Sequence, residues 1–211
     1  MQPQQRRRSL RLQGYDYTTS GAYFVTVCTQ HRACLFGDVV DNAVRLNAYG
    51  DIVLACWDAI PAHCANVELD AFVVMPNHVH GIIVLTDGMQ IASVPPMFPV
   101  GAQHAAPFPG PVPASLTPRP RVQPGSLGAI VRAFKSVVTQ RINAVRRRGT
   151  GAACCAPTST SPIWQRNYYE HVIRDEAALH RLREYIRDNP VSWADDEENP
   201  RRQIPPAQEK S

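Results

Sequence analysis

The chain has 211 residues, of which 44% are hydrophobic and 19% charged. This balance is typical of a globular protein with one sizeable core, and it excludes wholesale disorder. No run approaches the roughly eighteen consecutive apolar residues that a membrane span requires. The basic start MQPQQRRRSLRLQG has no apolar segment behind it. We therefore expect neither a membrane span nor a secretory signal, and a cytoplasmic location.

Basic residues outnumber acidic ones, 22 against 18, and all but two of the basic residues are arginines. The arginines cluster at two places, as Arg6, Arg7 and Arg8 and as Arg146, Arg147 and Arg148. Because the planar guanidinium forks onto phosphate oxygens, these clusters favour a phosphate-rich partner such as nucleic acid. Arginine usage can also follow the base composition of a genome. We interpret the six cysteines as free thiols without a role.

The first half of the chain predicts three strands and a helix. Residues 22–29 are β-branched and aromatic, which favours a strand. Apolar residues recur at helical spacing over 46–60, and Pro61 ends the pattern. Two further apolar runs, 69–75 and 78–85, are separated by a proline and an asparagine, which indicates a hairpin.

The second half contains a compositional break. Residues 87–124 hold ten of the chain's 19 prolines, so we interpret them as an extended insertion. Helical periodicity resumes over 125–148, and a possible strand within 163–173 precedes a last helix over 175–189. We expect one domain over 1–193 and an acidic, disordered tail over 194–211.

The predicted order is strand, helix, strand, strand, helix, possible strand, helix. Two neighbouring strands meet through a hairpin, which argues against a purely parallel sheet. The order therefore predicts an α+β fold, with a ferredoxin-like antiparallel sheet and helices packed on one face.

His78 and His80 are two residues apart on a predicted strand, so both side chains leave the same face while Val79 leaves the other. Two imidazoles placed in this way can converge on one metal ion. Ordinary surface histidines are the alternative. The strand is otherwise apolar, and Ile82 and Val84 share the histidines' face, where packing does not call for imidazoles.

Tyr185 and Asn189 lie four residues apart on the last predicted helix, and therefore on one face. A core stripe that ends in a capping asparagine is the alternative explanation. Together with the histidines, they would supply two imidazoles and an amide oxygen for a metal, and a phenol. A phenol with a pKa near 10 is a poor nucleophile unless a divalent ion polarises the phosphodiester that it attacks. The resulting phosphotyrosine retains the energy of the broken bond, so such a site could cut a strand and rejoin it.

Three segments together resemble the IS200-like single-tyrosine transposases of the HUH superfamily, and most of all their REP-associated branch. They are MPNHVHGIIVL (75–85), SLGAIVRAFKSVVTQRIN (126–143) and IWQRNYYEHVIRDEAALHRLREYIRDNPVSW (163–193). The resemblance covers about 10–86 and 125–193. It implies that Tyr185 is the nucleophile and that His78, His80 and Asn189 are the metal ligands. IS200-type enzymes usually have glutamine where this chain has Asn189, which points to the REP-associated branch.

The resemblance further implies an enzyme that uses Mg²⁺ or Mn²⁺ and cleaves single-stranded DNA beside a hairpin. The products would be a 5′-phosphotyrosine and a free 3′-OH. The partner would be a REP-like DNA hairpin, the location the bacterial nucleoid, and the protein a monomer or homodimer.

Two other hypotheses remain open from the sequence. One is a non-catalytic protein that binds a nucleic-acid hairpin through arginines and through Tyr168 and Tyr169. The other is a metal hydrolase in which water attacks. Within the leading hypothesis, Tyr168 or Tyr169 near His171 is an alternative nucleophile to Tyr185.

Overall fold

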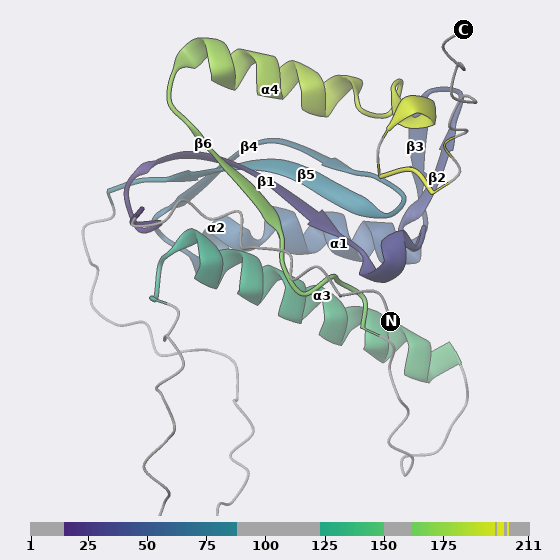
Figure 1. Cartoon of the computed structure of the whole chain (residues 1–211). Coiled ribbons are helices and arrows are strands. Elements are labelled where there is room, and N and C mark those ends of the chain that lie inside the picture. Colours follow the sequence, from purple (N-terminus) through teal and green to yellow (C-terminus); the bar gives the residue numbers. More distant parts are fainter. Residues whose placement is uncertain (1–14, 88–122, 150–161, 197, 201, 203–211) are drawn as a thin grey trace, which may run out of the picture.

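The computed structural model describes residues 15–87, 123–149, 162–196, 198–200 and 202 (Figure 1). Four strands and three helices form the body of the protein. In chain order these are β1 (Gly21–Cys28), α1 (Ala48–Asp58), β4 (Val67–Val74), β5 (His78–Leu85), α3 (Leu127–Gly149), β6 (Tyr169–Ile173) and α4 (Glu176–Asp188). Shorter elements connect them: η1 (Gln30–Arg32), β2 (Gly37–Val40), β3 (Ala43–Leu46), α2 (Ile60–His63) and η2 (Trp193–Asp195).

The four long strands form one antiparallel sheet in the order β4-β5-β1-β6. The first and third strands of the body therefore lie at the centre of the sheet, and the second and fourth lie at its edges. This βαββαβ arrangement is the ferredoxin-like α+β fold that the element order predicted, so that prediction is confirmed.

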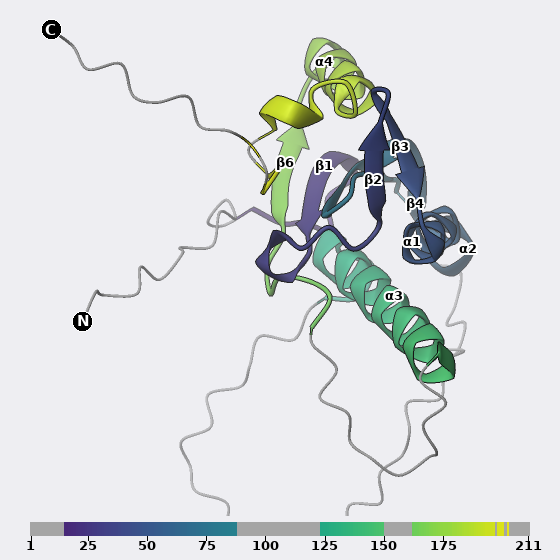
Figure 2. The same cartoon turned by 90° about the vertical axis from the view of Figure 1, so that its right-hand side faces the viewer.

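Helices cover both faces of the sheet. Figure 1 shows α1 and α3 on one side and α4 on the other, and Figure 2 shows the same layers after a quarter turn. Side chains point alternately to the two faces along each strand, and β1 and β5 carry apolar side chains on both faces. Each face therefore needs a layer of helix to cover it. Tyr23 and Val79 belong to the large core under α1 and α3, whereas Phe24 and Ile82 join a smaller core under α4. The sequence prediction placed helices on one face, and α4 adds the second layer.

A two-stranded ribbon, β2–β3, lies between β1 and α1 and was not predicted. Its two turn residues, Asp41 and Asn42, have φ values of 53° and 60°, as a tight hairpin turn requires. Each strand has only four residues, too short a run for alternation to identify. Among the described residues, the structure contains no helix that is both long and apolar enough to cross a membrane.

The proline-rich insertion falls mostly on residues 88–122, which lie outside the described residues, but both of its ends are anchored at Asn66. The Thr86 amide donates to the Asn66 carbonyl at 3.0 Å, and the Asn66 side chain donates to the Gly125 carbonyl at 3.3 Å. The chain therefore leaves β5 and enters α3 at neighbouring points.

We expect a short Gly/Ser linker in place of residues 90–122 to leave the protein folded and able to bind metal, because a short loop can join two neighbouring ends. Circular dichroism and calorimetric titration with Mn²⁺ would check this. The control replaces Asn66 with alanine in the shortened chain, which should lower its stability. Loss of folding on shortening alone would contradict the prediction.

The chain beyond 193 corrects the predicted boundary of the domain. The Arg32 guanidinium contacts both carboxylate oxygens of Glu198, at 2.8 and 3.2 Å. The carbonyl of Glu198 also accepts a hydrogen bond of 2.6 Å from the buried side chain of Asn77. The first residues of the expected disordered tail are therefore packed, because their charge has a specific partner. Residues 203–211 lie outside the described residues.

Candidate metal centre and tyrosine site

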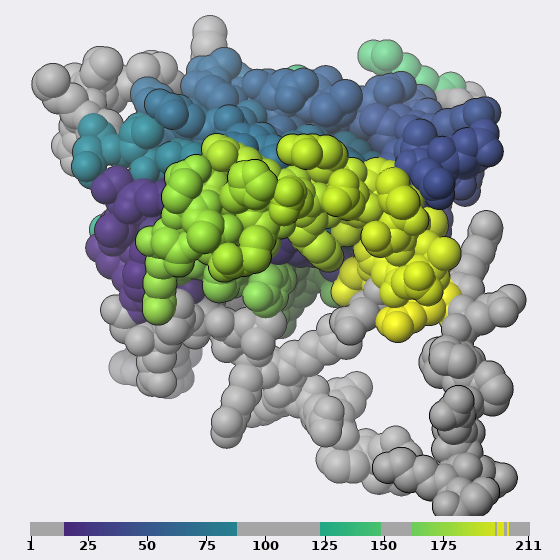
Figure 3. All heavy atoms as spheres, turned by 90° about the horizontal axis from the view of Figure 1, so that it is seen from above, coloured from purple at the N-terminus to yellow at the C-terminus, as the bar shows by residue number. Residues whose placement is uncertain are grey.

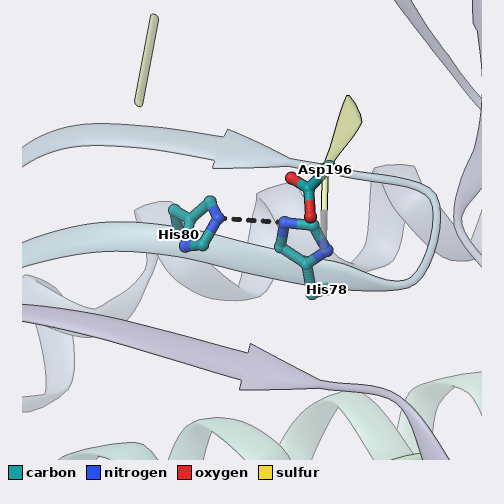
Figure 4. A group of neighbouring side chains, drawn as sticks. All are labelled: His78, His80 and Asp196. Atoms are coloured by element: carbon teal, nitrogen blue, oxygen red, sulfur yellow. Dashed lines mark hydrogen bonds between the residues drawn. The ribbon is translucent and has the colours of Figure 1, made fainter. Parts of the chain in front are cut away.

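His78 and His80 lie on β5 and point to the face that α4 covers. Their exposed fractions are 0% and 3%, and the two Nε2 atoms face each other at 3.0 Å (Figure 4). Val79 packs in the core on the opposite face, as the alternation predicted. The two imidazoles thus lie side by side, and their role as ligands of one metal ion stays a prediction.

Each imidazole is held from behind by a neighbouring polar side chain. His80 lies directly opposite Thr26 in the β1–β5 register, and its Nδ1 is 2.8 Å from the Thr26 hydroxyl. Nδ1 of His78 is 2.8 Å from the amide oxygen of Asn77. Both Nε2 atoms are therefore directed at one point, and Thr26 and Asn77 were not identified from the sequence.

Burial keeps both histidines neutral. Desolvation lowers the pKa of His78 to about 3, against a smaller opposite effect of the Asn189 amide. Burial and the neighbouring His78 ring lower the pKa of His80 to about 3, while Asp196 acts in the opposite direction. Neutral imidazoles keep a lone pair, so both rings are available as metal ligands at neutral pH.

Asn189 lies beside the histidines at the end of α4. The helix begins after Asp175, whose carboxylate accepts from the Ala178 amide, and ends at Asp188, so that Asn189 is its C-cap residue before a proline. Asn189 is 2% exposed, and its Oδ1 is buried without a hydrogen bond. Its φ of −57° is right-handed, so the left-handed capping role that favours asparagine does not apply. An unsatisfied buried amide oxygen is costly, and a cation would satisfy it.

Tyr185 lies one turn before Asn189 and presents its phenol to the same point. Its hydroxyl is 3.5 Å from Nε2 of His80, and its ring contacts that of Phe24 edge to face. The side chain is 48% exposed. A group bound from solvent can therefore reach this side chain, while the imidazoles beside it are buried.

Asp196 completes a cluster that the sequence analysis missed. Ligand atoms of His78, His80 and Asp196 all lie within 4.8 Å of one another, and Figure 4 shows the carboxylate above the His78 ring. In Figure 3, η2 and the residues after it continue the ridge of α4 across this face. The sequence predicted an acidic, disordered tail over 194–211, and Trp193, just before it, lies near His78.

The donor set suits a small divalent cation. Two neutral imidazoles, a buried amide oxygen without a hydrogen bond and a nearby carboxylate are ligands of the kind that Mn²⁺ and Mg²⁺ accept. The residues present therefore fit the metal site that the sequence predicted.

The competing tyrosines lie elsewhere. Tyr169 is 44% exposed and lies opposite Thr26 on β6, on the face of the sheet that carries His80 but two strands away. Tyr168 is half-buried and packs against the core under α3. His171 is exposed on β6, opposite Phe24.

Of the two predicted arginine clusters, the one that the structure describes does not join this site. Arg146, Arg147 and Arg148 form the last turn of α3, which packs against the other face of the sheet (Figure 1). The Arg146 guanidinium lies 5.6 Å from the centre of the Tyr49 ring. Residues Arg6, Arg7 and Arg8 lie outside the described residues. The described cysteines (Cys28, Cys34, Cys56 and Cys64) form no disulfide with one another, as expected.

An ion pair fixes α4 over the sheet. Both oxygens of Asp70 accept from the Arg183 guanidinium, at 3.0 Å from Nε and 2.6 Å from Nη2. Asp70 lies where the β4–β5 register is irregular. Arg183 and Tyr185 lie two residues apart on the same helix. The two hydrogen bonds to Asp70 therefore also restrain where the phenol lies along the sheet.

We expect Asp70→Asn to lower the free energy of unfolding by about 1 kcal/mol at pH 7, since the pair is partly exposed. Hydrogen bonding to Arg183 lowers the pKa of Asp70. The contribution is therefore complete above the ordinary carboxyl pKa of about 4 and disappears as the pH falls through the lower folded value. Urea unfolding of both proteins at pH 7 and pH 2 checks this. Asp38→Asn, at an exposed carboxylate on β2, should have no such effect, and equal losses in both variants would contradict the assignment.

Comparisons with known proteins agree with the fold. No family model matches the chain. A Haemophilus influenzae protein, described as uncharacterized, is 36% identical over 194 residues, which make up 90% of this chain and 92% of that protein. A solved structure of a REP-associated tyrosine transposase bound to a REP hairpin superposes with a TM-score of 0.51. The two are 17% identical, and the match covers 89% of this chain and 81% of that chain.

Proposed function

We propose a function on this premise: the chain belongs to one family with the Haemophilus influenzae protein and has the fold of the IS200-like single-tyrosine transposases. The proposed activity is that of a metal-dependent, single-strand DNA endonuclease and strand transferase that acts beside a hairpin. The observation that carries it is the Tyr185 hydroxyl, which lies 3.5 Å from Nε2 of His80 in the buried imidazole pair, on a side chain that is itself 48% exposed. The solved neighbour is bound to a REP hairpin, which supports a REP-like palindrome as the substrate.

In the proposed reaction the Tyr185 oxygen attacks the phosphorus of a phosphodiester. A bond forms between this oxygen and phosphorus, the bond to the 3′ oxygen breaks, and the DNA remains attached as a 5′-phosphotyrosine. The phenol loses a proton, and the departing 3′ oxygen gains one as a free 3′-OH. Attack by a 3′-OH on the phosphotyrosine reverses the steps and rejoins a strand.

His78, His80 and Asn189 would hold the divalent ion, with Asp196 as a further oxygen donor. When bound, the ion supplies positive charge that polarises the phosphodiester and stabilises the charge developing on its oxygens. One rigid helix carries both Tyr185 and Asn189, so the nucleophile and a ligand are positioned together. Displacement at phosphorus tolerates little misplacement, and the ion pair between Arg183 and Asp70 supports this alignment.

The test is a covalent adduct between the protein and a single-stranded oligonucleotide that contains a hairpin. We expect the adduct to survive denaturation and to require Mn²⁺ or Mg²⁺, so that EDTA prevents it. A protein that only binds hairpins would form none, and a metal hydrolase would cut the oligonucleotide without becoming attached. Cleavage in the presence of EDTA would show that the reaction does not need a divalent ion.

Hairpin binding should depend strongly on salt. For single strands the logarithm of the affinity falls by about 0.7 per phosphate neutralised for each unit of log salt. We expect replacement of Arg146, Arg147 and Arg148 by glutamine to flatten this slope by about two units, and replacement of Arg6, Arg7 and Arg8 to act in the same direction. Fluorescence anisotropy between 50 and 300 mM salt, roughly the range in which such slopes are resolved, measures it. Arg45→Gln on β3, which breaks an ion pair with Asp41, is the control. An unchanged slope would show that these arginines do not contact the DNA phosphates.

A further inference from the structure

The two imidazoles of the site are held by partners of different chemistry. The Asn77 side chain is fully buried, and its Nδ2 donates to two backbone carbonyls, those of Arg32 at 3.0 Å and Glu198 at 2.6 Å. A carbonyl only accepts, so these contacts fix the orientation of the amide. The Asn77 Oδ1 then faces Nδ1 of His78 at 2.8 Å and must accept from it. His78 therefore carries its hydrogen on Nδ1 and has a lone pair on Nε2.

The contact between the two histidines then defines the hydrogen positions on His80. The Nε2 atoms are 3.0 Å apart, and two lone pairs facing each other at this distance would repel, so whenever no ion lies between them one of the two must carry a hydrogen. Nε2 of His78 has none, so Nε2 of His80 is the donor. Because His80 is neutral, its Nδ1 has a lone pair and accepts from the Thr26 hydroxyl at 2.8 Å.

Binding one ion between the two Nε2 atoms requires a lone pair on each. His78 already has it. His80 must carry its hydrogen on Nδ1 instead, and the Thr26 hydroxyl must then accept. A hydroxyl can rotate from donor to acceptor, whereas an amide oxygen cannot. One proton leaves Nε2 for solvent and another joins Nδ1, so the ring stays neutral and Thr26 keeps its own hydrogen.

We propose that Asn77 and Thr26 are positioning residues of the metal site with different roles. Asn77 holds His78 permanently in the tautomer that binds metal, and Thr26 allows His80 to change tautomer when the ion binds. Both residues are buried, so they act through the histidines. The inference rests on the proposed function in one respect, namely that the histidine pair binds a divalent ion.

Nitrogen-15 NMR of the histidine rings tests the tautomers in the full-length protein. In the metal-free protein we expect the Nδ1–H form for His78 and the Nε2–H form for His80. Zn²⁺, a diamagnetic probe, should move His80 alone to the Nδ1–H form. Identical tautomers of the two rings before metal is added, or a change in His78 on adding it, would overturn the proposal.

Two variants test Thr26 through metal affinity. Thr26→Val keeps the shape of the side chain and removes the hydroxyl, so Nδ1–H of His80 loses its acceptor in the metal-bound protein. We expect calorimetry with Mn²⁺ to give an affinity about tenfold lower, the range found when such supporting partners are lost. Thr26→Ser keeps the hydroxyl and should restore the affinity. Equal affinities for the valine and serine variants would overturn the role of Thr26.

The outcomes separate this inference from the proposed function. A wild-type protein that binds Mn²⁺, with no difference between the Thr26 variants, contradicts the inference alone. A wild-type protein that binds neither Mn²⁺ nor Zn²⁺ contradicts both. If Thr26→Val does not fold, the NMR experiment on the wild-type protein decides.

Discussion

Tyr185→Phe is expected to abolish the covalent protein–DNA adduct while the protein still folds and binds hairpin DNA and metal. The change removes one oxygen from a side chain that is 48% exposed, so stability should change by less than about 0.5 kcal/mol. Without the hydroxyl, no atom of this side chain can attack phosphorus. We expect a loss on the order of a thousandfold or more, as for nucleophiles in other enzymes. Denaturing electrophoresis with a labelled hairpin oligonucleotide measures it.

The matched control for this experiment is Tyr169→Phe. Tyr169 is exposed to a similar extent, 44%, and lies on the same face of the sheet, but it is two strands away from His80. We expect this variant to form the adduct at nearly the wild-type rate, with weaker binding if its ring stacks on a base. Peptide mapping of the adduct to Tyr168 or Tyr169 would overturn the assignment of Tyr185 and leave the reaction class standing.

His78→Ala or His80→Ala is expected to abolish cleavage and leave hairpin binding largely intact. The imidazoles face the buried point where a metal would bind, whereas the arginines of α3 lie on the other side of the sheet (Figure 1). Calorimetry with Mn²⁺ should show no binding to either variant, and anisotropy should show a hairpin affinity within about threefold of wild type. Because imidazole suits Mn²⁺ better than Mg²⁺, activity of the wild-type protein with Mn²⁺ should equal or exceed that with Mg²⁺.

His171→Ala provides the control for these variants. It removes an exposed histidine from β6, on the same face of the sheet, and His171 is not among the ligand candidates. Cleavage and metal binding should both persist in it. Loss of hairpin binding together with cleavage in a folded His80→Ala protein would show that metal and DNA binding are not separate.

Local sequence patterns predicted much of the fold and of the site. The apolar run 78–85 predicted β5 with its observed bounds, and the alternation of side chains along a strand placed the two histidines on one face. The four-residue spacing of Tyr185 and Asn189 predicted their common orientation, because a helix sets it regardless of the rest of the chain. Both features depend only on residues close together in the sequence.

Contacts between distant residues could not be predicted in this way. Thr26 meets His80 across 54 positions, and Arg183 meets Asp70 across 113. The β1–β5 register and the placement of α4 create these pairs, and neither leaves a local periodic signal. The acidic segment after Trp193 was misjudged for the same reason, since a run of carboxylates looks solvated until Arg32 and Asn77 are known to lie opposite.

The sequence by itself therefore determined the long strands and helices and which of their side chains share a face, because strand alternation and helical pitch are properties of the local backbone. Only the tertiary structure decided which groups surround the two histidines. It placed α4 over the histidines, directed the Asn189 oxygen inward without a hydrogen bond, and added Asp196 from beyond the expected end of the domain. The physical reason is that packing and charge pairing depend on which distant surfaces meet, and that is settled when the sheet and its two helical layers assemble.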